Sequence, residues 1–529
     1  MSALIIYNGP IYTMDPAQPQ VQAIGIRDGR VAALGAVGKV RAALGQTDAL
    51  DLRGRPLIPA LTDAHVHLIW HALARQTVRL DGLTEFSAVL DRIAAAHAAL
   101  PPGAWLQGGG WDHTLWGGRW PTAADLDRVA PDRPVLLSRK DGHSAWINHT
   151  TIALAAIDDT TPDPPGGAIG RDAGLPNGLL YENAIGLVRR LIPAETAEER
   201  LDAVRAACAE AHSYGMVGVH IPAGIRPRDG GLALEVAQTL RTRGELGLRC
   251  LVYVGLDEFE GALALGMRGG FGDSMVRFGG LKLFIDGTLG SETAELLTPY
   301  AGSKTNTGLP TLDDATLYDA IRRASTAGIP VMTHAIGDRA ARRVLDAIEE
   351  SLPHAAPLAL PHRIEHCQLL DEADFARFAA LGVVASVQPV HQVADAPTAD
   401  RLWGKRCARA YAWRTLRDAG ATLAFGSDAP VEALDPWPGI HAAVNRCAPG
   451  ETTPWYPAQK LSVFEAIHGF TTGAAQVGGV AHEQGRIALG YQADFAVLSR
   501  DPFTTAPGQL YDTRAELTML GGQIVYERK

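Results

Sequence analysis

The stretch "LIPALTDAHVHL", residues 57–68, runs from apolar residues into Asp63, His65 and His67. Its apolar half is typical of a buried strand. Because residues two positions apart in a strand point to the same face, His65 and His67 are expected to aim at one point, where two neutral imidazoles suit a divalent metal. The chain has 17 His, so such a pair also arises by chance, and a metal site requires further ligands from other segments.

Further short apolar segments downstream predict more buried strands. They lie at 216–223, 248–255, 277–287, 329–338, 362–370, 383–391 and 421–431. Between most of them lie Ala-rich amphipathic segments that end on glycine, as helices do. Eight buried strands alternating with helices predict an α/β fold of the (β/α)8 TIM-barrel class. The alternative is a doubly wound open sheet, but no G-x-G-x-x-G follows an early strand to support it.

The two ends of the chain have a different sequence pattern from the middle. Residues 1–56 and 485–529 contain short strands separated by turn dipeptides such as Asp28-Gly29 and Gly521-Gly522. We therefore expect a small composite β-sandwich domain built from both termini, with the barrel at 57–484. Residues 70–205 are too long for a simple connection and are expected to form an insertion or lid after the first barrel strand.

The predicted insertion is rich in tryptophan, at Trp105, Trp111, Trp116, Trp120 and Trp146. One interpretation is an aromatic substrate pocket over the C-terminal face of the barrel, touched by Trp111, Asp112 and His143. The other is that these tryptophans are the core of the insertion itself. His391, placed at the end of the seventh strand, is a further candidate for binding substrate.

Polar residues stand near the C-terminal ends of five of the predicted strands. An unpaired charge in such an apolar setting costs several kcal/mol, so a shared partner is expected. In a closed barrel these ends converge on one rim, and the polar residues would meet there as a metal cluster. The members are His65 and His67 on the first strand, Lys282 on the fourth, His334 on the fifth, His366 on the sixth and Asp428 on the eighth.

This ordered set resembles the amidohydrolase superfamily. The phrases "KLFIDGTLGSETA", "THAIGDRA", "RIEHCQ" and "GSDAPV" are similar to its Amidohydro_3 branch, which includes N-substituted formamide deformylases and YtcJ-like hydrolases. The resemblance extends over nearly the whole chain. One departure is Ala60, where these proteins usually have glycine after the proline. Alanine is tolerable there if φ is negative.

The resemblance implies a binuclear metal site, most often with Zn²⁺. The two first-strand histidines would bind the more buried ion, and His334 and His366 the more exposed one. Lys282, carboxylated by CO2 on its Nζ, would bridge the two ions, because a carbamate is anionic whereas an ammonium would be repelled. Asp428 would complete the shell of the buried ion and carry the proton. An unmodified Lys282, lying beside the ligands or in an ion pair, is the alternative.

The implied reaction is hydrolysis of a C–N bond in an amide, N-substituted formamide or cyclic amide by metal-activated hydroxide, in the EC 3.5 class. One alternative is a single-metal deaminase of the same superfamily. Deaminases resemble H-x-x-E after the fifth strand, but His334 is followed by Ala335, Ile336 and Gly337. A second alternative is a non-catalytic scaffold with a decayed site, which metal content would expose.

Three acidic residues are given supporting roles. Asp63 shares the strand parity of the first-strand histidines and is expected to orient a ligand. Glu365 precedes the sixth-strand histidine, so strand alternation points it away from that imidazole as a buried ion-pair partner. Asp286 lies four residues beyond the fourth-strand lysine and is expected to line the pocket.

The composition, 47% hydrophobic and 20% charged, is that of an ordinary globular protein. The formal net charge of -10, with no basic cluster, argues against a nucleic-acid partner. The five Cys lie far apart without a C-x-x-C, which indicates free thiols in a reducing compartment. With no signal peptide and no apolar run of about 18 residues, we expect a cytoplasmic protein without a membrane partner. The expected partner is a small-molecule substrate, and a homodimer is left open.

Overall fold

The structure is a computed structural model that describes residues 3–74, 77–139, 144–164, 167–193, 195–224 and 228–529. The chain divides into two compact units. The main unit comprises Met1–His71 and Val204–Lys529, and the inserted unit comprises Ala72–Ala203. Each unit is described by itself.

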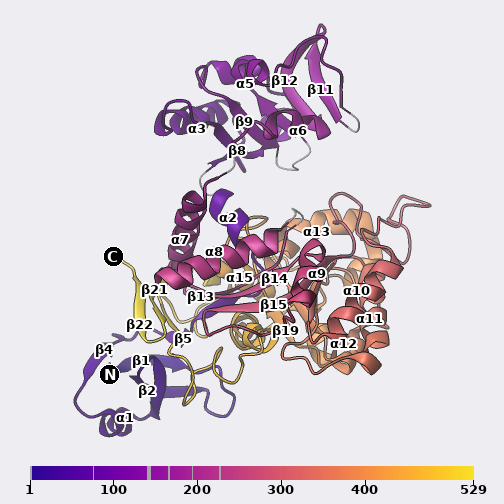
Figure 1. Ribbon diagram of the computed structural model, residues 1–529. Coiled ribbons are helices and arrows are strands. Elements are labelled where there is room, and N and C mark those ends of the chain that lie inside the picture. The colour runs from indigo at the N-terminus through magenta and orange to yellow at the C-terminus, as the bar shows by residue number, and fades with distance from the viewer. Residues whose placement is uncertain (1–2, 75–76, 140–143, 165–166, 194, 225–227) are drawn as a thin grey trace. The chain divides into compact units, whose positions relative to one another are not determined.

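The main unit contains an eight-stranded sheet with the order β19-β18-β17-β16-β15-β14-β13-β6. Its neighbouring strands β13, β14 and β15 are labelled in Figure 1. Every neighbouring pair along this path is parallel. The strands are β6 (Leu61–Asp63), β13 (Met216–Ile221), β14 (Arg249–Val254), β15 (Val276–Phe284), β16 (Val331–Ala335), β17 (Arg363–His366), β18 (Val384–Val387) and β19 (Leu423–Phe425). These eight strands lie at the eight predicted places, which confirms the expected barrel.

The barrel is nearly closed between its first and last strands. Just beyond β6, the Ala64 N–H donates to the Phe425 carbonyl at 2.9 Å, and the Asp428 N–H donates to the His65 carbonyl at 2.8 Å. These bonds join the segments that follow β6 and β19. The candidate residues at 63–67 and 427–429 are therefore neighbours despite their distance in the sequence.

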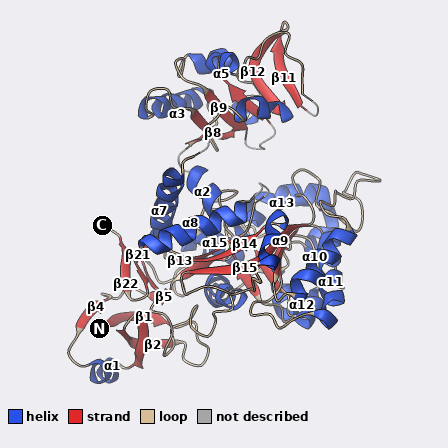
Figure 2. Cartoon of the chain, in the orientation of Figure 1, coloured by secondary structure: helices blue, strands red, loops and turns tan. Residues whose placement is uncertain are grey.

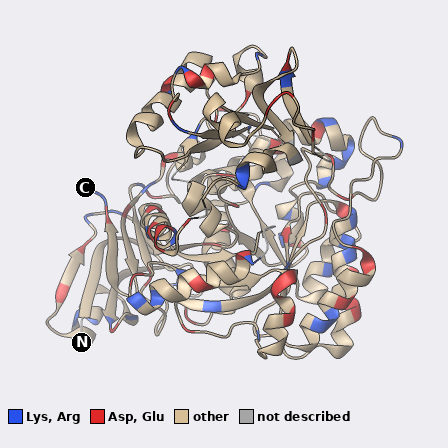
Figure 3. Ribbon diagram, turned by 45° about the horizontal axis from the view of Figure 1, so that its top comes forward, with Lys and Arg blue, Asp and Glu red and all other residues tan. Residues whose placement is uncertain are grey.

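Helices surround the strands of the barrel (Figure 2). They include α8 (Asp229–Arg243), α9 (Phe259–Ala264), α10 (Asp314–Thr326), α11 (Asp338–Ser351), α12 (Phe375–Leu381), α13 (Pro389–Trp403), α14 (Trp413–Asp418), α15 (Pro436–Asn445), α16 (Val463–His468) and α17 (Ala474–Val477). In α10, Asp313 caps the first turn by accepting from the Thr316 N–H at 2.8 Å. Leu317, Ile321 and Ala324, spaced by three or four residues, form its buried face. Acidic and basic residues are interspersed along several of these helices, among them α10 and α11 (Figure 3).

The stretch 57–68 is not one strand, contrary to the prediction. β5 (Leu57–Pro59) pairs in a second sheet, and only β6 belongs to the barrel. Ala60 lies between them with its N–H on the Asp494 carbonyl at 2.9 Å, and its φ is not positive, so the absence of glycine causes no strain. His65 and His67 lie in the loop between β6 and α2 (Leu68–Ala74), not within a strand.

The second sheet of the main unit combines both ends of the chain. Its order is β22-β21-β20-β5-β1-β2-β3, with β4 paired to β1. The strands are β1 (Ala3–Tyr12), β2 (Gln20–Arg27), β3 (Arg30–Gly35), β4 (Asp48–Asp51), β20 (Phe495–Leu498), β21 (Ala515–Leu520) and β22 (Gln523–Glu527), with α1 (Val37–Leu44) after β3. Ile6, Ile24, Phe495 and Met519 share one core, so both ends contribute to it. The arrangement as a two-layer sandwich stays a prediction.

The inserted unit has its own six-stranded sheet with the order β11-β12-β10-β9-β8-β7. Its strands are β7 (Val78–Arg79), β8 (Leu106–Trp111), β9 (Val135–Arg139), β10 (Ser144–Ile147), β11 (Gly167–Asp172) and β12 (Leu175–Glu182). Its helices are α3 (Phe86–Ala99), α4 (Ala123–Asp127), α5 (His149–Leu154) and α6 (Gly186–Arg189), and α7 (Ala197–Ser213) leads into the main unit. Trp111 and Trp146 are fully buried in its core. A role for this unit as a lid stays a prediction.

Within the described part of the chain, every helix is too short or too polar to span a lipid bilayer.

Candidate metal centre

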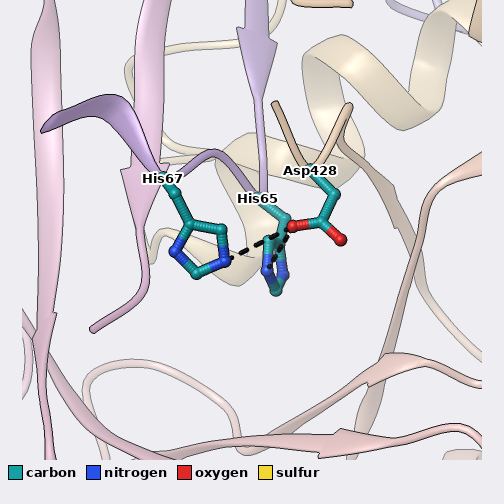
Figure 4. A group of neighbouring side chains, drawn as sticks. All are labelled: His65, His67 and Asp428. Carbon is teal, nitrogen blue, oxygen red and sulfur yellow. Dashed lines mark ion pairs between the residues drawn. The ribbon is translucent and has the colours of Figure 1, made fainter. Parts of the chain in front are cut away.

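Two imidazoles and a carboxylate converge where β6 and β19 end. His65 Nε2 lies 3.5 Å, and His67 Nε2 3.4 Å, from Asp428 Oδ1 (Figure 4). His65 and Asp428 are buried, and the His67 side chain is 14% exposed. One ligand atom from each residue lies within 4.8 Å of the other two. The three side chains therefore form a compact nitrogen and oxygen donor set.

A buried carboxylate ties together the two loops that present these side chains. Asp63 Oδ1 accepts from the His65 N–H at 2.9 Å and from the Ser427 N–H at 3.1 Å. Burial raises the pKa of Asp63 to about 7. Asp428 itself adopts a left-handed φ of 60°, a conformation that costs a non-glycine residue about 1–3 kcal/mol unless its surroundings impose it. Asp63 thus joins the backbone at His65 to the backbone next to Asp428, and its role in orienting a metal ligand stays a prediction.

His366 reaches the same place with a left-handed backbone conformation. It is the last residue of β17 and has a φ of 73°, which turns its side chain relative to a regular strand. Its ring centroid lies 5.2 Å from that of His65, while the Glu365 carboxylate hydrogen-bonds His65 Nδ1. Glu365 and His366, adjacent on β17, therefore both contact His65, and the prediction that Glu365 points away from His366 stays a prediction.

Behind His65 lies a fully buried ion pair. Glu365 pairs with Arg363, as the expectation of an ion-pair partner required. Arg363 also donates to the Ser386 hydroxyl at 2.7 Å and to the Ala64 carbonyl. Burial would raise the pKa of Glu365, but Arg363 and His65 hold it at about 2. The ionised carboxylate fixes the proton of His65 on Nδ1 and leaves Nε2, the nitrogen facing Asp428, as an acceptor.

The electrostatics of the rim keep His65, His334 and His366 neutral and the Asp428 carboxylate ionised. Burial lowers the pKa of His65 to about 4 and that of His334 to about 3. Burial also holds the pKa of His366 well below its ordinary value. For Asp428, burial alone would raise the pKa, but the neighbouring imidazoles, His65 foremost, hold it well below its ordinary value. Neutral imidazoles and an ionised carboxylate are the protonation states in which these groups bind metals.

Lys282 lies on β15 and is 2% exposed. Its Nζ has no hydrogen-bond partner among the described residues and lies 4.6 Å from the centre of the Phe284 ring. Burial lowers the pKa of the amine to about 8, against the opposing pull of Glu365 and Asp428. This arrangement is unusual, because a buried lysine amine normally has an ion-pair or hydrogen-bond partner.

His334 lies on β16, with its ring centroid 4.5 Å from that of His366. Its Nε2 is 3.1 Å from the Gly287 carbonyl oxygen and 3.5 Å from Asp286 Oδ1. Asp286 was expected to line the pocket. Its carboxylate instead accepts three backbone N–H groups, from Glu295, Ile336 and Gly337, and so fixes the loops around His334.

His391 does not end the seventh strand, as predicted, but lies in the first turn of α13. β18 ends at Val387, and Pro389 opens the helix, a position that proline favours. His391 Nε2 lies 3.8 Å from Asp428 Oδ2, and its ring is stacked on that of His366 at 6.1 Å with an interplanar angle of 10°. His366, His391 and Asp428 form a second group whose ligand atoms lie within 4.8 Å of one another.

The candidate substrate contacts Trp111 and Asp112 belong to the inserted unit, and each has hydrogen-bond partners within that unit. Trp111 has no exposed surface, and its Nε1 donates to the Leu137 carbonyl at 2.8 Å, which fits the core interpretation. Asp112 accepts from the Thr114 N–H and from Arg139. His143 lies outside the described residues. Their contact with substrate stays a prediction.

Sequence reasoning did not identify several polar residues beside the centre. Arg363 was not singled out, although an arginine two residues from a glutamate on a buried strand is a readable signal of an internal ion pair. The side-chain amides of Gln388 and Gln392 are buried, and neither atom of either amide has a partner among the described residues. Gln388 is the extended residue just before α13, and Gln392 lies near the start of that helix.

The chemistry of the side chains present fits one or two divalent ions. Buried polar atoms are nearly always hydrogen-bonded, yet Lys282 Nζ, His366 Nδ1 and His391 Nε2 have no partner within the described part of the chain. Imidazole nitrogens and carboxylate oxygens are ligands that Zn²⁺ and similar ions prefer. Two groups of three such side chains, sharing Asp428, therefore meet the requirements of a metal centre.

Comparisons with known proteins agree with this chemistry. Residues 48–526 match Amidohydro_3, the amidohydrolase family. The chain is 35% identical over 534 residues to "Putative amidohydrolase YtcJ" of Bacillus subtilis (strain 168), with 99% of each chain covered. It is 28% identical to N-substituted formamide deformylase of Arthrobacter pascens, covering 100% of this chain and 99% of that one. An uncharacterized metal-dependent hydrolase from Pyrococcus furiosus superposes with a TM-score of 0.78 at 30% identity, over 95% of this chain and 100% of that one.

Proposed function

The chain belongs to the amidohydrolase family, and from this membership we propose that it is a metal-dependent enzyme that hydrolyses a C–N bond of an amide, N-substituted formamide or cyclic amide. The observation that carries the proposal is the convergence of His65, His67 and Asp428 on one point. The similarity to a protein named N-substituted formamide deformylase over the whole chain supports the bond type.

We assign the first ion to His65, His67 and Asp428, and the second ion to His334 and His366. Lys282, as a carbamate formed with CO2, would supply an anionic ligand to both ions. The buried and unpartnered Nζ of Lys282 supports this assignment, because carboxylation converts a poorly solvated amine into an anion suited to two cations. The proposed metal is Zn²⁺.

When bound, such ions act as Lewis acids and lower the pKa of water to near 7. The protein's own groups then handle protons and geometry. Asp428, placed between both groups of ligands, is the proton carrier: it accepts a proton from the nucleophilic water and delivers it to the leaving nitrogen, which departs only when protonated. Glu365, paired with Arg363, keeps His65 in one tautomer. Asp63 fixes the backbone at His65 and at Ser427, the residue before Asp428.

The deaminase alternative is disfavoured by the space around residue 337. Deaminases of this superfamily resemble H-x-x-E after the fifth strand, and the glutamate position here is Gly337. A Cβ at Gly337 would lie 2.0 Å from the Glu295 carbonyl oxygen, so a glutamate at this position would require the backbone at Glu295 to move. Asp338, one position later, is engaged by the Leu297 N–H at 2.8 Å.

The test is metal analysis combined with a substrate screen. The full chain is purified, its Zn²⁺ content is counted, and hydrolysis of N-formyl and N-acyl amines is measured before and after chelation. We expect bound Zn²⁺, turnover of at least one N-formyl or N-acyl amine, loss of turnover on chelation and recovery when Zn²⁺ is returned. A chain that binds no divalent metal would support the alternative of a non-catalytic scaffold and overturn the proposal.

A further inference from the structure

Resting on the proposed function, we infer that His391 is a ligand of the second ion, together with His366 and Asp428. Asp428 then contributes one carboxylate oxygen to each ion. The family resemblance assigns no metal-binding role to the position of His391, which the sequence singled out only as a contact for substrate.

The two oxygens of Asp428 face different imidazoles. Oδ1 is the oxygen at 3.5 Å from His65 Nε2 and 3.4 Å from His67 Nε2, whereas Oδ2 lies 3.8 Å from His391 Nε2. These distances are too long for good hydrogen bonds. Two ligands on one tetrahedral Zn²⁺, each about 2.0–2.1 Å from the ion, are about 3.3 Å apart. The spacing around both oxygens is therefore closer to that of ligands on a shared ion than to that of hydrogen-bonded partners.

The unsatisfied nitrogens at this place point to the same conclusion. His391 is 8% exposed and His366 is 5% exposed. His391 Nε2 and His366 Nδ1 both lack a hydrogen-bond partner among the residues that the structure describes. His391 Nε2 faces the Asp428 carboxylate at 3.8 Å, a distance at which the two are not hydrogen-bonded. A cation satisfies the nitrogen and the carboxylate at once.

The position of His391 on α13 makes it a rigid donor. The helix begins at Pro389, whose fixed φ suits a first turn, and the stacking of the His391 ring on His366 holds both imidazoles nearly parallel. His334 belongs to neither group of three; because its Nε2 donates to the Gly287 carbonyl, its Nδ1 is the nitrogen left to bind the second ion. The second ion therefore has a donor from the helix after β18 in addition to the family-type donors from β16 and β17.

The experiment compares His391→Ala and His391→Gln with the wild-type chain, with His441→Ala as the matched control. His441 is also a buried histidine, 2% exposed, on α15, where it contacts the Asn445 side chain. Each full-length protein is stripped of metal and titrated with Zn²⁺ by calorimetry. A parallel titration with Co²⁺ follows the visible absorption spectrum, which reports the ligands of each ion.

We expect two Zn²⁺ per wild-type chain, and two in the control. In both His391 variants the first ion should bind as in the wild type, whereas the affinity for the second should fall by at least about 100-fold. The Co²⁺ spectrum at one equivalent should be unchanged, and the spectral change from the second equivalent should be lost. His391→Gln preserves most of the side-chain volume, so it remains informative if the alanine variant does not fold.

A His391→Gln chain that binds two Zn²⁺ with wild-type affinity overturns the inference and leaves the proposed function intact. A wild-type chain that binds one ion only also overturns the inference. A wild-type chain that binds none overturns the proposed function itself.

Discussion

The buried pair of Glu365 and Arg363 allows a quantitative prediction. Both side chains are 0% exposed, and the Glu365 carboxylate also accepts a hydrogen bond from His65 Nδ1. Replacing Glu365 with alanine leaves the Arg363 cation buried without a carboxylate, and breaking such a pair costs about 3–5 kcal/mol of unfolding free energy. Because His65 also loses its hydrogen-bond acceptor, the affinity for the first ion should fall by about 10–100-fold.

The assay measures both quantities on the same protein. Unfolding of the metal-free chain in urea gives the free-energy change, and a Zn²⁺ titration gives the affinity. The control is Asp319→Asn, which removes the exposed ion pair with Arg322, 2.5 Å long, on α10. Such surface pairs contribute about 0–1 kcal/mol, and this one is remote from the metal centre. If Glu365→Ala matches Asp319→Asn in stability and the wild type in Zn²⁺ affinity, the positioning argument is refuted.

Three further predictions follow from single sites. Lys282→Ala should lower kcat by at least about 100-fold, and full activity without added short carboxylates would contradict the bridging carbamate. Gly337→Ala should destabilise the chain by about 1–3 kcal/mol in urea unfolding, because its Cβ meets the Glu295 carbonyl oxygen at 2.0 Å. The control Gly261→Ala, where the new Cβ has open space, should leave the stability unchanged. Equal urea midpoints for the two variants would refute the packing account. Burial lowers the pKa of His362 to about 4 in the folded chain. As the pH falls below about 6.5, His362 is therefore protonated in the unfolded chain before it is protonated in the folded chain. Between pH 7 and pH 4, the stability of the wild type should therefore decline by about 3 kcal/mol more than that of His362→Gln. A difference between the urea midpoints of the two proteins that does not change with pH would show that His362 is not held neutral.

The barrel was predictable because its strands are buried on both faces. A closed parallel sheet covered by helices leaves short, nearly uninterrupted apolar runs, and those runs marked all eight strands. The division of 57–68 between two sheets was not predictable locally. It depends on the backbone partners Asp494 for Ala60 and Gly215 for Leu61, which lie far away in the sequence.

The side chains at the rim were predictable as a set, but not their directions. The positive φ of His366, a non-glycine residue, leaves no mark in the sequence. The position of His391 depends on where β18 gives way to α13, and the proline at 389 was the one available signal of that boundary. The sharing of Asp428 between two groups of imidazoles is a matter of distances, which a one-dimensional pattern does not contain.

The most direct test of the account is the anomalous scattering of a crystal of the chain grown with Zn²⁺, measured at the zinc absorption edge. The account predicts a strong peak within about 2.0–2.2 Å of one imidazole nitrogen of His65, one of His67 and a carboxylate oxygen of Asp428. If the three side chains were well ordered and no anomalous peak lay among them, the assignment of a metal centre to this rim would be contradicted.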